Sequence, residues 1–245
     1  MKLKVINSNS KGNCYLLGNN EETLILECGV KFPQIQKALN FELSKVVGCI
    51  VTHEHKDHCV SINEVMNKGI NVYASKGTFS KIPNLTHRAK VLKKLQKQKI
   101  GGFTILPFDV KHDAAEPFGY LIHHKECGNV LFLTDTYYSP YKFKNLNNII
   151  IEANYSEEIM DSKAGYGNLN TFVRNRVLES HLSIETCKKL LLANDLTKVN
   201  NIVLIHLSDA NSDEIQFQKE VEEMTLKTVT VANPDLEIDF NINPF

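Results

Sequence analysis

The sequence lacks an excess charge of either sign, because 28 lysines and arginines balance 28 aspartates and glutamates. Bulk charge therefore does not identify a nucleic-acid partner, and an anionic ligand would have to be attracted by a local site. The six cysteines are scattered and include no CxxC pair. Cys28, Cys49 and Cys127 lie in or beside apolar runs, so we interpret the cysteines as small hydrophobic residues in a reducing compartment, without disulfides.

Long hydrophobic runs are also missing. No window approaches the ~18 apolar residues of a membrane span, and residues 1–8 contain no apolar segment of the kind found in signal peptides. The chain has no internal repeat and no low-complexity linker. Its 245 residues, of which 42% are hydrophobic, suit one globular domain over residues 1–245. We therefore expect a cytoplasmic protein without membrane attachment.

Short apolar segments of strand length recur along the chain. They cover residues 2–6, 14–17, 23–29, 45–52, 70–74, 103–110, 120–124, 130–134, 148–153, 199–205 and 229–232. A polar turn is expected at 7–13, and helices are expected at 32–40, 61–68, 184–194 and 212–224. Many strands with few helices indicate two packed sheets flanked by helices, an α/β (α+β) layered architecture.

A dense group of potential metal ligands follows the apolar strand at 45–52. Its members are His53, His55, Asp57 and His58. Imidazole nitrogens and carboxylate oxygens suit a divalent ion of the zinc or manganese type, whereas structural histidines usually occur singly. If the strand continued, His53 and His55 would lie on the same face of it. The group therefore predicts a metal site rather than a polar loop.

Further candidate ligands stand at or just past the ends of other apolar strands, at Glu27, His112, Asp135 and His206. Strand ends can form a common rim, where residues distant in sequence meet. Taken singly, each of His112, Asp135 and His206 is equally compatible with a surface or core role. Together with the first group they suffice for two ions. We assign His53, His55 and His112 to one metal, and Asp57, His58 and His206 to the other, with Asp135 bridging.

The spacing His53-x-His55-x-Asp57-His58, followed by His112, Asp135 and His206, resembles the metallo-β-lactamase fold superfamily. The resemblance covers nearly the whole chain. It implies a four-layer αβ/βα sandwich with a two-metal site at the edge of two sheets. A β-lactamase itself is disfavoured, because many such enzymes place a cysteine on the second metal, and Asp135 stands at that strand end here.

Other segments are similar to the WalJ/YycJ-type branch of this superfamily, whose members are single-domain proteins regarded as DNA exonucleases. These segments are residues 8–13, 112–120, 134–136, 180–183 and 205–208. The branch implies manganese as the metal, whereas the fold at large implies zinc. The chain departs from the pattern at Glu27, where the fold usually has an aspartate that steadies the metal loop. It also departs at Tyr155, where the branch tends to have histidine, and at Glu179, where glycine is more usual.

The implied activity is metal-dependent phosphodiester hydrolysis by a hydroxide held between the two ions. Asp57 is expected to orient that hydroxide as well as to ligate. His181 is the candidate to bind phosphate or protonate the leaving oxygen. The alternative for His181 is a structural place at the start of a helix, because Ser183 suits an N-cap. The polar and poorly periodic segment 154–183, which contains His181, is expected to form an irregular flank of the active site.

Three functions compete at this point. The first is a nuclease, with DNA as the expected nucleic-acid partner and cleavage from an end. The second is a small-molecule metallohydrolase of the same fold, such as a cyclic phosphodiesterase, lactonase or thioesterase. The third is a non-catalytic relative, which the complete ligand set disfavours. Between the first two, the basic residues within 76–99 favour nucleic acid and the neutral net charge favours a small molecule.

Overall fold

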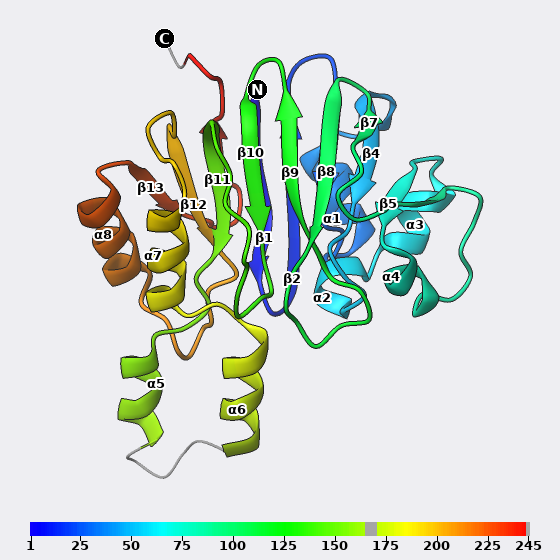
Figure 1. Ribbon diagram of the computed structural model, residues 1–245. Helices are drawn as coiled ribbons and strands as arrows, with labels where there is room; N and C mark the ends of the chain where they lie inside the picture. The colour runs from blue at the N-terminus through cyan, green and yellow to red at the C-terminus, as the bar shows by residue number, and fades with distance from the viewer. Residues whose placement is uncertain (165–170, 244–245) are drawn as a thin grey trace.

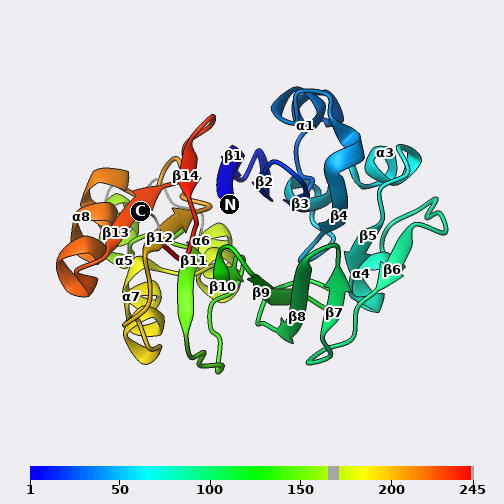
Figure 2. The same ribbon diagram turned by 90° about the horizontal axis from the view of Figure 1, so that it is seen from above.

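Two seven-stranded sheets face each other in the computed structural model, which describes residues 1–164 and 171–243 (Figure 1, Figure 2). The first sheet contains, in spatial order, β14 (Glu237–Asp239), β1 (Lys2–Asn9), β2 (Gly12–Gly18), β3 (Thr23–Leu26), β4 (Val46–Ile50), β5 (Val72–Ala74) and β6 (Ala89–Val91). The second contains β13 (Thr228–Val231), β12 (Asn201–Ile205), β11 (Leu146–Glu152), β10 (Gly128–Leu133), β9 (Phe118–His124), β8 (Phe103–Asp109) and β7 (Gln98–Ile100).

Helices cover the outer faces of both sheets and one edge of the sandwich (Figure 1). They are α1 (Phe32–Ala38), α2 (Lys56–Cys59), α3 (Ile62–Asn67), α4 (Lys76–Ser80), α5 (Glu157–Ala164), α6 (Thr171–Ser180), α7 (Ile184–Ala193) and α8 (Glu214–Thr225), with a short 3-10 turn, η1 (Leu43–Lys45). Seen from above, α1 and α3 lie outside the first sheet and α7 lies outside the second (Figure 2).

Three groups of buried side chains join these layers. The central group lies between the sheets, where Tyr15 of β2 meets Phe132 of β10 edge to face with their ring centroids 5.9 Å apart. A second group packs α1 and α3 on the first sheet, and a third packs α7 and α8 on the second sheet. The order helix, sheet, sheet, helix confirms the predicted four-layer αβ/βα sandwich.

The strands β10, β11 and β12 run parallel and have apolar residues on both faces. In β11, Ile150 belongs to the central group, whereas Ile149 and Ile151 face the layer of α7 and α8. Both faces of these strands are covered, which explains their continuous apolar sequence. Because the strands are parallel, their carboxyl ends reach one edge of the sandwich together.

The first turn of the chain is tighter than expected. A turn was predicted over 7–13, but β1 continues to Asn9 and β2 begins at Gly12, with Ser8 paired to Asn13. These strands can contain polar residues because the polar side chains contact the candidate metal ligands His206 and Asp57. Ser8 accepts a hydrogen bond from the backbone of His206 at 2.9 Å, and Asn13 is buried against Asp57.

The polar segment 154–183, predicted as an irregular flank of the active site, contains two helices. They are α5 and α6, which extend beyond the strand ends instead of packing on a sheet (Figure 1). A helix without a sheet beneath it needs no broad apolar stripe, so its periodicity is weak in the sequence. Residues 165–170 of this segment lie outside the described residues.

Two expectations about composition can be compared with the structure. All six cysteines are buried and free of disulfides within the described chain. Among residues 1–164 and 171–243, no helix has the length and apolar character needed to cross a membrane.

Candidate metal centre

The predicted ligand residues meet where the carboxyl ends of strands from both sheets converge. Asp135 and His206 follow β10 and β12, and the 53–58 group follows β4. The strand β4 ends at Ile50, earlier than predicted, so His53 and His55 lie in a loop and not on one strand face. His55 is the N-cap residue of α2, which contains Asp57 and His58. The short helix turns the chain back, so that both ends of the group point to the same edge.

One histidine group consists of His53, His55 and His112, whose potential ligand atoms all lie within 4.8 Å of one another. His112 Nε2 is 3.1 Å from His55 Nδ1. The other nitrogen of His112, Nδ1, donates a hydrogen bond to the carbonyl oxygen of Ser180 at 2.7 Å. This bond fixes the tautomer and leaves Nε2 as the nitrogen available to a metal.

A second group consists of Asp57, His58, Asp135 and His206, again with potential ligand atoms within 4.8 Å. Asp57 Oδ2 is 3.3 Å from His58 Nε2 and 3.4 Å from His206 Nε2. His206 Nδ1 donates to Glu152 Oε1 at 3.0 Å, which leaves Nε2 as the free nitrogen. The group therefore combines two imidazoles and two carboxylates, the donors that divalent zinc and manganese accept.

Asp135 belongs to the second group but also faces the first. Its Oδ1 lies 3.3 Å from both His58 Nε2 and His206 Nδ1. Its Oδ2 lies 3.8 Å from His53 Nε2 and 3.7 Å from His112 Nε2. The two oxygens of one buried carboxylate thus point to two different sets of histidines.

Glu152, the last residue of β11, was missed by the sequence reasoning. It is fully buried, and Oε1 accepts hydrogen bonds from His181 Nδ1 at 2.7 Å and from His206 Nδ1 at 3.0 Å. Its Oε2 accepts from the backbone amides of Thr136 at 3.2 Å and Leu182 at 3.1 Å. The signal was present, because Glu152 is an acid at the end of an apolar strand, like Glu27 and Asp135.

His181 lies directly after α6 and is brought to the centre by Glu152. Its Nδ1 is 3.8 Å from Asp135 Oδ2, and a fifth of its side chain is exposed. Burial alone would lower the pKa of His181, but the charge of the Glu152 carboxylate and the hydrogen bond to it raise that pKa above its usual range. His181 is thus a partly exposed imidazole at the border of the centre, and Glu152 favours its protonated form.

Glu27, at the position where the resemblance implies an aspartate, is fully buried behind His58. Its Oε1 is 3.6 Å from His58 Nδ1 and accepts a hydrogen bond from the Thr52 backbone amide at 3.2 Å. The carboxylate therefore lies between the end of β4 and α2 and supports the loop that carries the histidines. The neighbouring Gly29 lies so close to this loop that an added Cβ would be 1.7 Å from the carbonyl oxygen of Asp57.

Three residues of this edge have left-handed backbone conformations. The φ angles are 64° at Glu27, 44° at Asp135 and 55° at His206. Such conformations cost on the order of 1–3 kcal/mol each in non-glycine residues and cluster at functional sites. At each position the chain leaves a strand abruptly, and the side chain is thereby directed to the shared edge.

The donor set fits bound cations. In the described part of the chain, His53 Nε2 and His206 Nε2 are buried without a hydrogen-bond partner, a state that costs about 1–3 kcal/mol for each polar group. Burial lowers the pKa of His53 and His112, so both imidazoles are in the neutral, metal-binding form. Burial alone would raise the pKa of Asp135, but His206 and His58 hold it well below its usual value, so the carboxylate is anionic.

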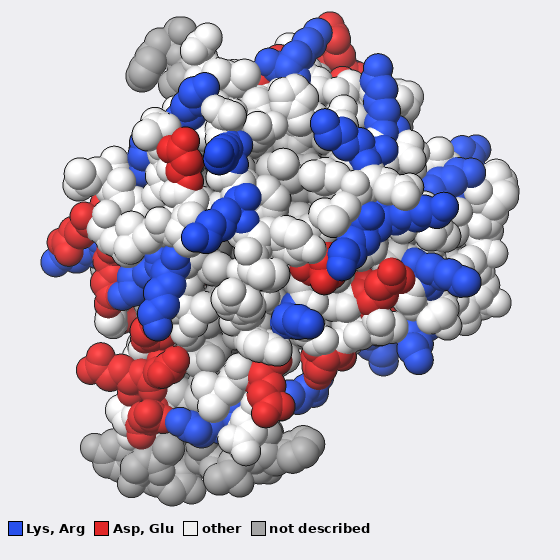
Figure 3. Space-filling view, in the orientation of Figure 1, with Lys and Arg blue, Asp and Glu red and all other residues white. Residues whose placement is uncertain are grey.

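One of the basic residues within 76–99, Lys94, is paired with Asp109 at 3.0 Å. Asp109 is the last residue of β8, three residues before His112. Figure 3 shows lysine and arginine side chains spread over most of one face, whereas acidic side chains gather at its lower left, over α5. Glu157, Glu158 and Asp161 of α5 contribute to that acidic surface.

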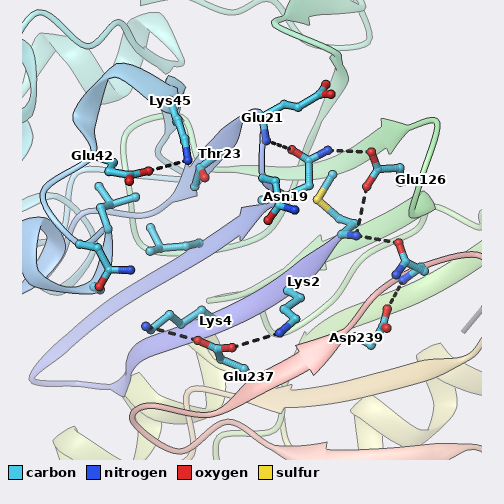
Figure 4. A pocket seen from close by; sticks show the side chains of 18 residues that line it. Lys2, Lys4, Asn19, Glu21, Thr23, Glu42, Lys45, Glu126, Glu237 and Asp239 are labelled. Carbon is cyan, nitrogen blue, oxygen red and sulfur yellow. Dashed lines mark hydrogen bonds and ion pairs between the residues drawn. The ribbon is translucent and has the colours of Figure 1, made fainter.

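A separate pocket of about 670 Å³ lies at the amino end of β1 (Figure 4). The cations drawn in it are paired with acids. Lys2 and Lys4 lie 3.6 and 3.4 Å from Glu237, and Lys45 pairs with Glu42. The pocket contains none of the predicted ligand residues, so it is not the metal centre.

Comparison with known proteins agrees with this geometry. A sequence model described as the beta-lactamase superfamily domain matches residues 24–207. Exodeoxyribonuclease WalJ of Streptococcus pneumoniae is 27% identical over 259 residues, covering 98% of this chain and 93% of the relative. Exodeoxyribonuclease YycJ of Bacillus anthracis is 27% identical over 232 residues, covering 88% and 86%.

Solved structures share the fold at low sequence identity. The metallo-beta-lactamase fold protein YhfI of Bacillus subtilis superposes with a TM-score of 0.72 at 15% identity, covering 97% of this chain and 99% of that one. A diphosphatase of the PhnP family superposes with a TM-score of 0.68 at 12% identity, covering 97% of both chains. These similarities show the architecture of the chain. The histidine and aspartate groups indicate that the chain binds divalent metal.

Proposed function

The chain belongs to the beta-lactamase superfamily and is a metal-dependent hydrolase. From this premise we propose that it is a two-metal phosphodiesterase that degrades DNA from an end. The observation that carries the two-metal part is the position of Asp135, whose two oxygens face two different histidine groups. The observation that favours DNA is the similarity to two exodeoxyribonucleases over most of the chain.

In this proposal, His53, His55 and His112 would hold one ion, while Asp57, His58 and His206 would hold the other. Asp135, whose two oxygens face both groups, would complete the set. Two bound divalent ions would supply a nucleophilic hydroxide near neutral pH and would neutralise charge on the phosphoryl group. Zinc and manganese both suit this set of donors.

The protein residues supply orientation and proton transfer. Asp57 Oδ2 lies 3.3 Å from His58 Nε2 and 3.4 Å from His206 Nε2 at the border of the second group, a place from which it can orient the attacking oxygen. Glu152 accepts a hydrogen bond from His181 Nδ1 and raises the pKa of His181 above its usual range, which favours the form with a second proton on Nε2. From Nε2 that form can bind a phosphoryl oxygen or protonate the leaving oxygen. Glu152 positions both His181 and His206 without reaching the substrate, because it is fully buried.

A small-molecule metallohydrolase, such as a cyclic phosphodiesterase, lactonase or thioesterase, is the second candidate. The acidic surface of α5 favours it, because the exposed Glu157 and Glu158 repel a polyanion, although Asp161 is paired with Arg174 at 2.6 Å. The effect of salt concentration on binding separates the two candidates. For single-stranded DNA, the logarithm of the binding constant falls with the logarithm of the salt concentration, with a slope of about −0.7 for each phosphate neutralised. A small neutral ester would scarcely respond.

The test is incubation of the purified protein with end-labelled single- and double-stranded DNA in the presence of Mn²⁺, Zn²⁺ or EDTA. We expect progressive shortening from one end with metal and none with EDTA. His55→Ala and Asp135→Ala should abolish this activity while the circular dichroism spectrum is retained. Full activity in both variants would refute the assignment of the centre, and intact DNA with wild-type protein in every metal would refute the nuclease.

A further inference from the structure

Two large aromatic side chains are exposed immediately after the centre. Tyr137 and Tyr138 have relative exposures of 44% and 50%. They stand two and three residues after Asp135, in the connection between β10 and β11. Exposed aromatic rings are costly to leave in water and are enriched where a protein binds a partner.

The backbone of this tyrosine pair is fixed beside the centre. The backbone amide of Tyr137 donates a hydrogen bond to the carbonyl of Lys111 at 3.2 Å, and the backbone amide of Lys111 donates one to Thr136 Oγ1 at 3.0 Å. Thr136 Oγ1 also donates to the carbonyl of Tyr138 at 2.8 Å. The two tyrosines are therefore held against the residue that precedes His112, and they do not belong to a free loop.

The rest of the connection leads away from the centre. Because β10 and β11 are parallel, residues 134–145 must return along the length of the strands. Tyr141 and Phe143 are anchored on the sheet, with ring centroids 5.3 and 4.9 Å from that of Phe108. The lysines between and after them, Lys142 and Lys144, are exposed.

Beyond Asp135, the charged residues of this connection are lysines. Residues 137–144, Tyr-Tyr-Ser-Pro-Tyr-Lys-Phe-Lys, contain no acid. The nearby Asp109 is already engaged by Lys94 at 3.0 Å and by the hydroxyl of Tyr141. A surface that begins with exposed rings at a phosphodiesterase centre and continues with cations has the chemistry that binds an unpaired polynucleotide strand.

We propose that residues 137–144 form a single-strand track, in which Tyr137 and Tyr138 stack on bases next to the cleaved bond and Lys142 and Lys144 contact phosphates farther along. The track rests on the proposed function and adds how the strand is held. It also explains how a chain without net charge can retain a polyanion, since stacking is independent of charge.

The experiment compares two labelled oligonucleotides of about ten nucleotides, a length within the usual range of single-strand sites. One is oligothymidylate and the other carries abasic tetrahydrofuran residues, so charge and length are equal and only bases differ. Both contain hydrolysis-resistant phosphorothioate linkages, and binding to the metal-loaded protein is measured by fluorescence anisotropy. The proteins are wild type, Tyr137→Ala/Tyr138→Ala, Lys142→Ala/Lys144→Ala, and Phe41→Ala as a control. Phe41 is an aromatic residue with 71% exposure beyond the end of α1.

The wild type and Phe41→Ala should bind oligothymidylate about 5- to 100-fold more tightly than the abasic strand. The double tyrosine variant should lose this preference while binding the abasic strand normally. The double lysine variant should keep the preference for oligothymidylate. In a plot of the logarithm of the binding constant against the logarithm of the salt concentration, its slope should be less steep by about 1.4, because two phosphate contacts are lost.

Equal binding of the two strands by wild type would overturn the track. A retained preference in the tyrosine variant, with a change in oligomeric state by light scattering, would also overturn it and assign the tyrosines to a contact between copies. A wild type that prefers bases but leaves ordinary DNA uncut would refute the proposed function and leave the track standing.

Discussion

Replacement of Glu152 by glutamine tests how the centre is held together. The carboxylate accepts four hydrogen bonds, two from His181 and His206 and two from the backbone amides of Thr136 and Leu182. A glutamine side chain has one oxygen and one NH₂ group, so it can satisfy only one of these pairs. If its oxygen faces the histidines, two buried backbone amides lose their acceptor, at a cost of about 1–3 kcal/mol each.

The opposite orientation harms the centre directly. The NH₂ group would then face the Nδ1 atoms of His181 and His206, and these nitrogens would have to become acceptors. The proton of His206 would move to Nε2, the nitrogen that otherwise faces Asp57. We therefore expect Glu152→Gln to lower the free energy of unfolding by about 2–6 kcal/mol, or to weaken metal binding by about 10- to 100-fold.

Urea unfolding and metal titration measure the two effects in the same protein. Glu27→Gln is the matched control, because Glu27 is also fully buried at this edge but accepts hydrogen bonds from only one backbone amide, that of Thr52. Its loss of stability should be smaller. If Glu152→Gln matched the wild type in both stability and metal affinity, Glu152 would not be the residue that positions the histidines.

Two further predictions concern packing. Gly29→Ala should destabilise the protein by about 1–3 kcal/mol and reduce metal binding, because the new Cβ would overlap the Asp57 carbonyl. Calorimetry and metal titration measure the two effects. A variant with the stability and metal affinity of the wild type would contradict this prediction. All six cysteines are buried, and burial raises the pKa of Cys59 and Cys127 to about 12. A thiol reagent at neutral pH should therefore label the native protein much more slowly than the protein unfolded in guanidinium. Fast labelling of the native protein would show that these thiols are accessible.

The architecture and most of the residues that gather at this edge could be predicted from the sequence, because both depend on strand ends. Apolar runs marked the strands, and acids or histidines just beyond them marked the edge where Asp135 and His206 meet the 53–58 group. Glu152 obeyed the same rule but was overlooked, since its own strand ended in a segment interpreted only as a flank. Its role depends on His181, which is distant in sequence and is brought near by α6.

Other features had no signal in the sequence. The left-handed conformations of Glu27, Asp135 and His206 occur at residues that do not favour them, and tertiary contacts impose them. The helices α5 and α6 lack an apolar stripe because no sheet lies under them. The exposure of Tyr137 and Tyr138 depends on how the connection after β10 is fixed, whereas tyrosines in an unknown fold are commonly part of a core.

The number of metal ions bound per chain tests the two-metal centre most directly. The protein should be loaded with Zn²⁺ or Mn²⁺, freed of excess ion and analysed by native mass spectrometry. The account predicts two ions per wild-type chain and one in His55→Ala, because the group of Asp57, His58, Asp135 and His206 remains complete. A single ion in the wild type, or two ions retained in His55→Ala, would contradict it.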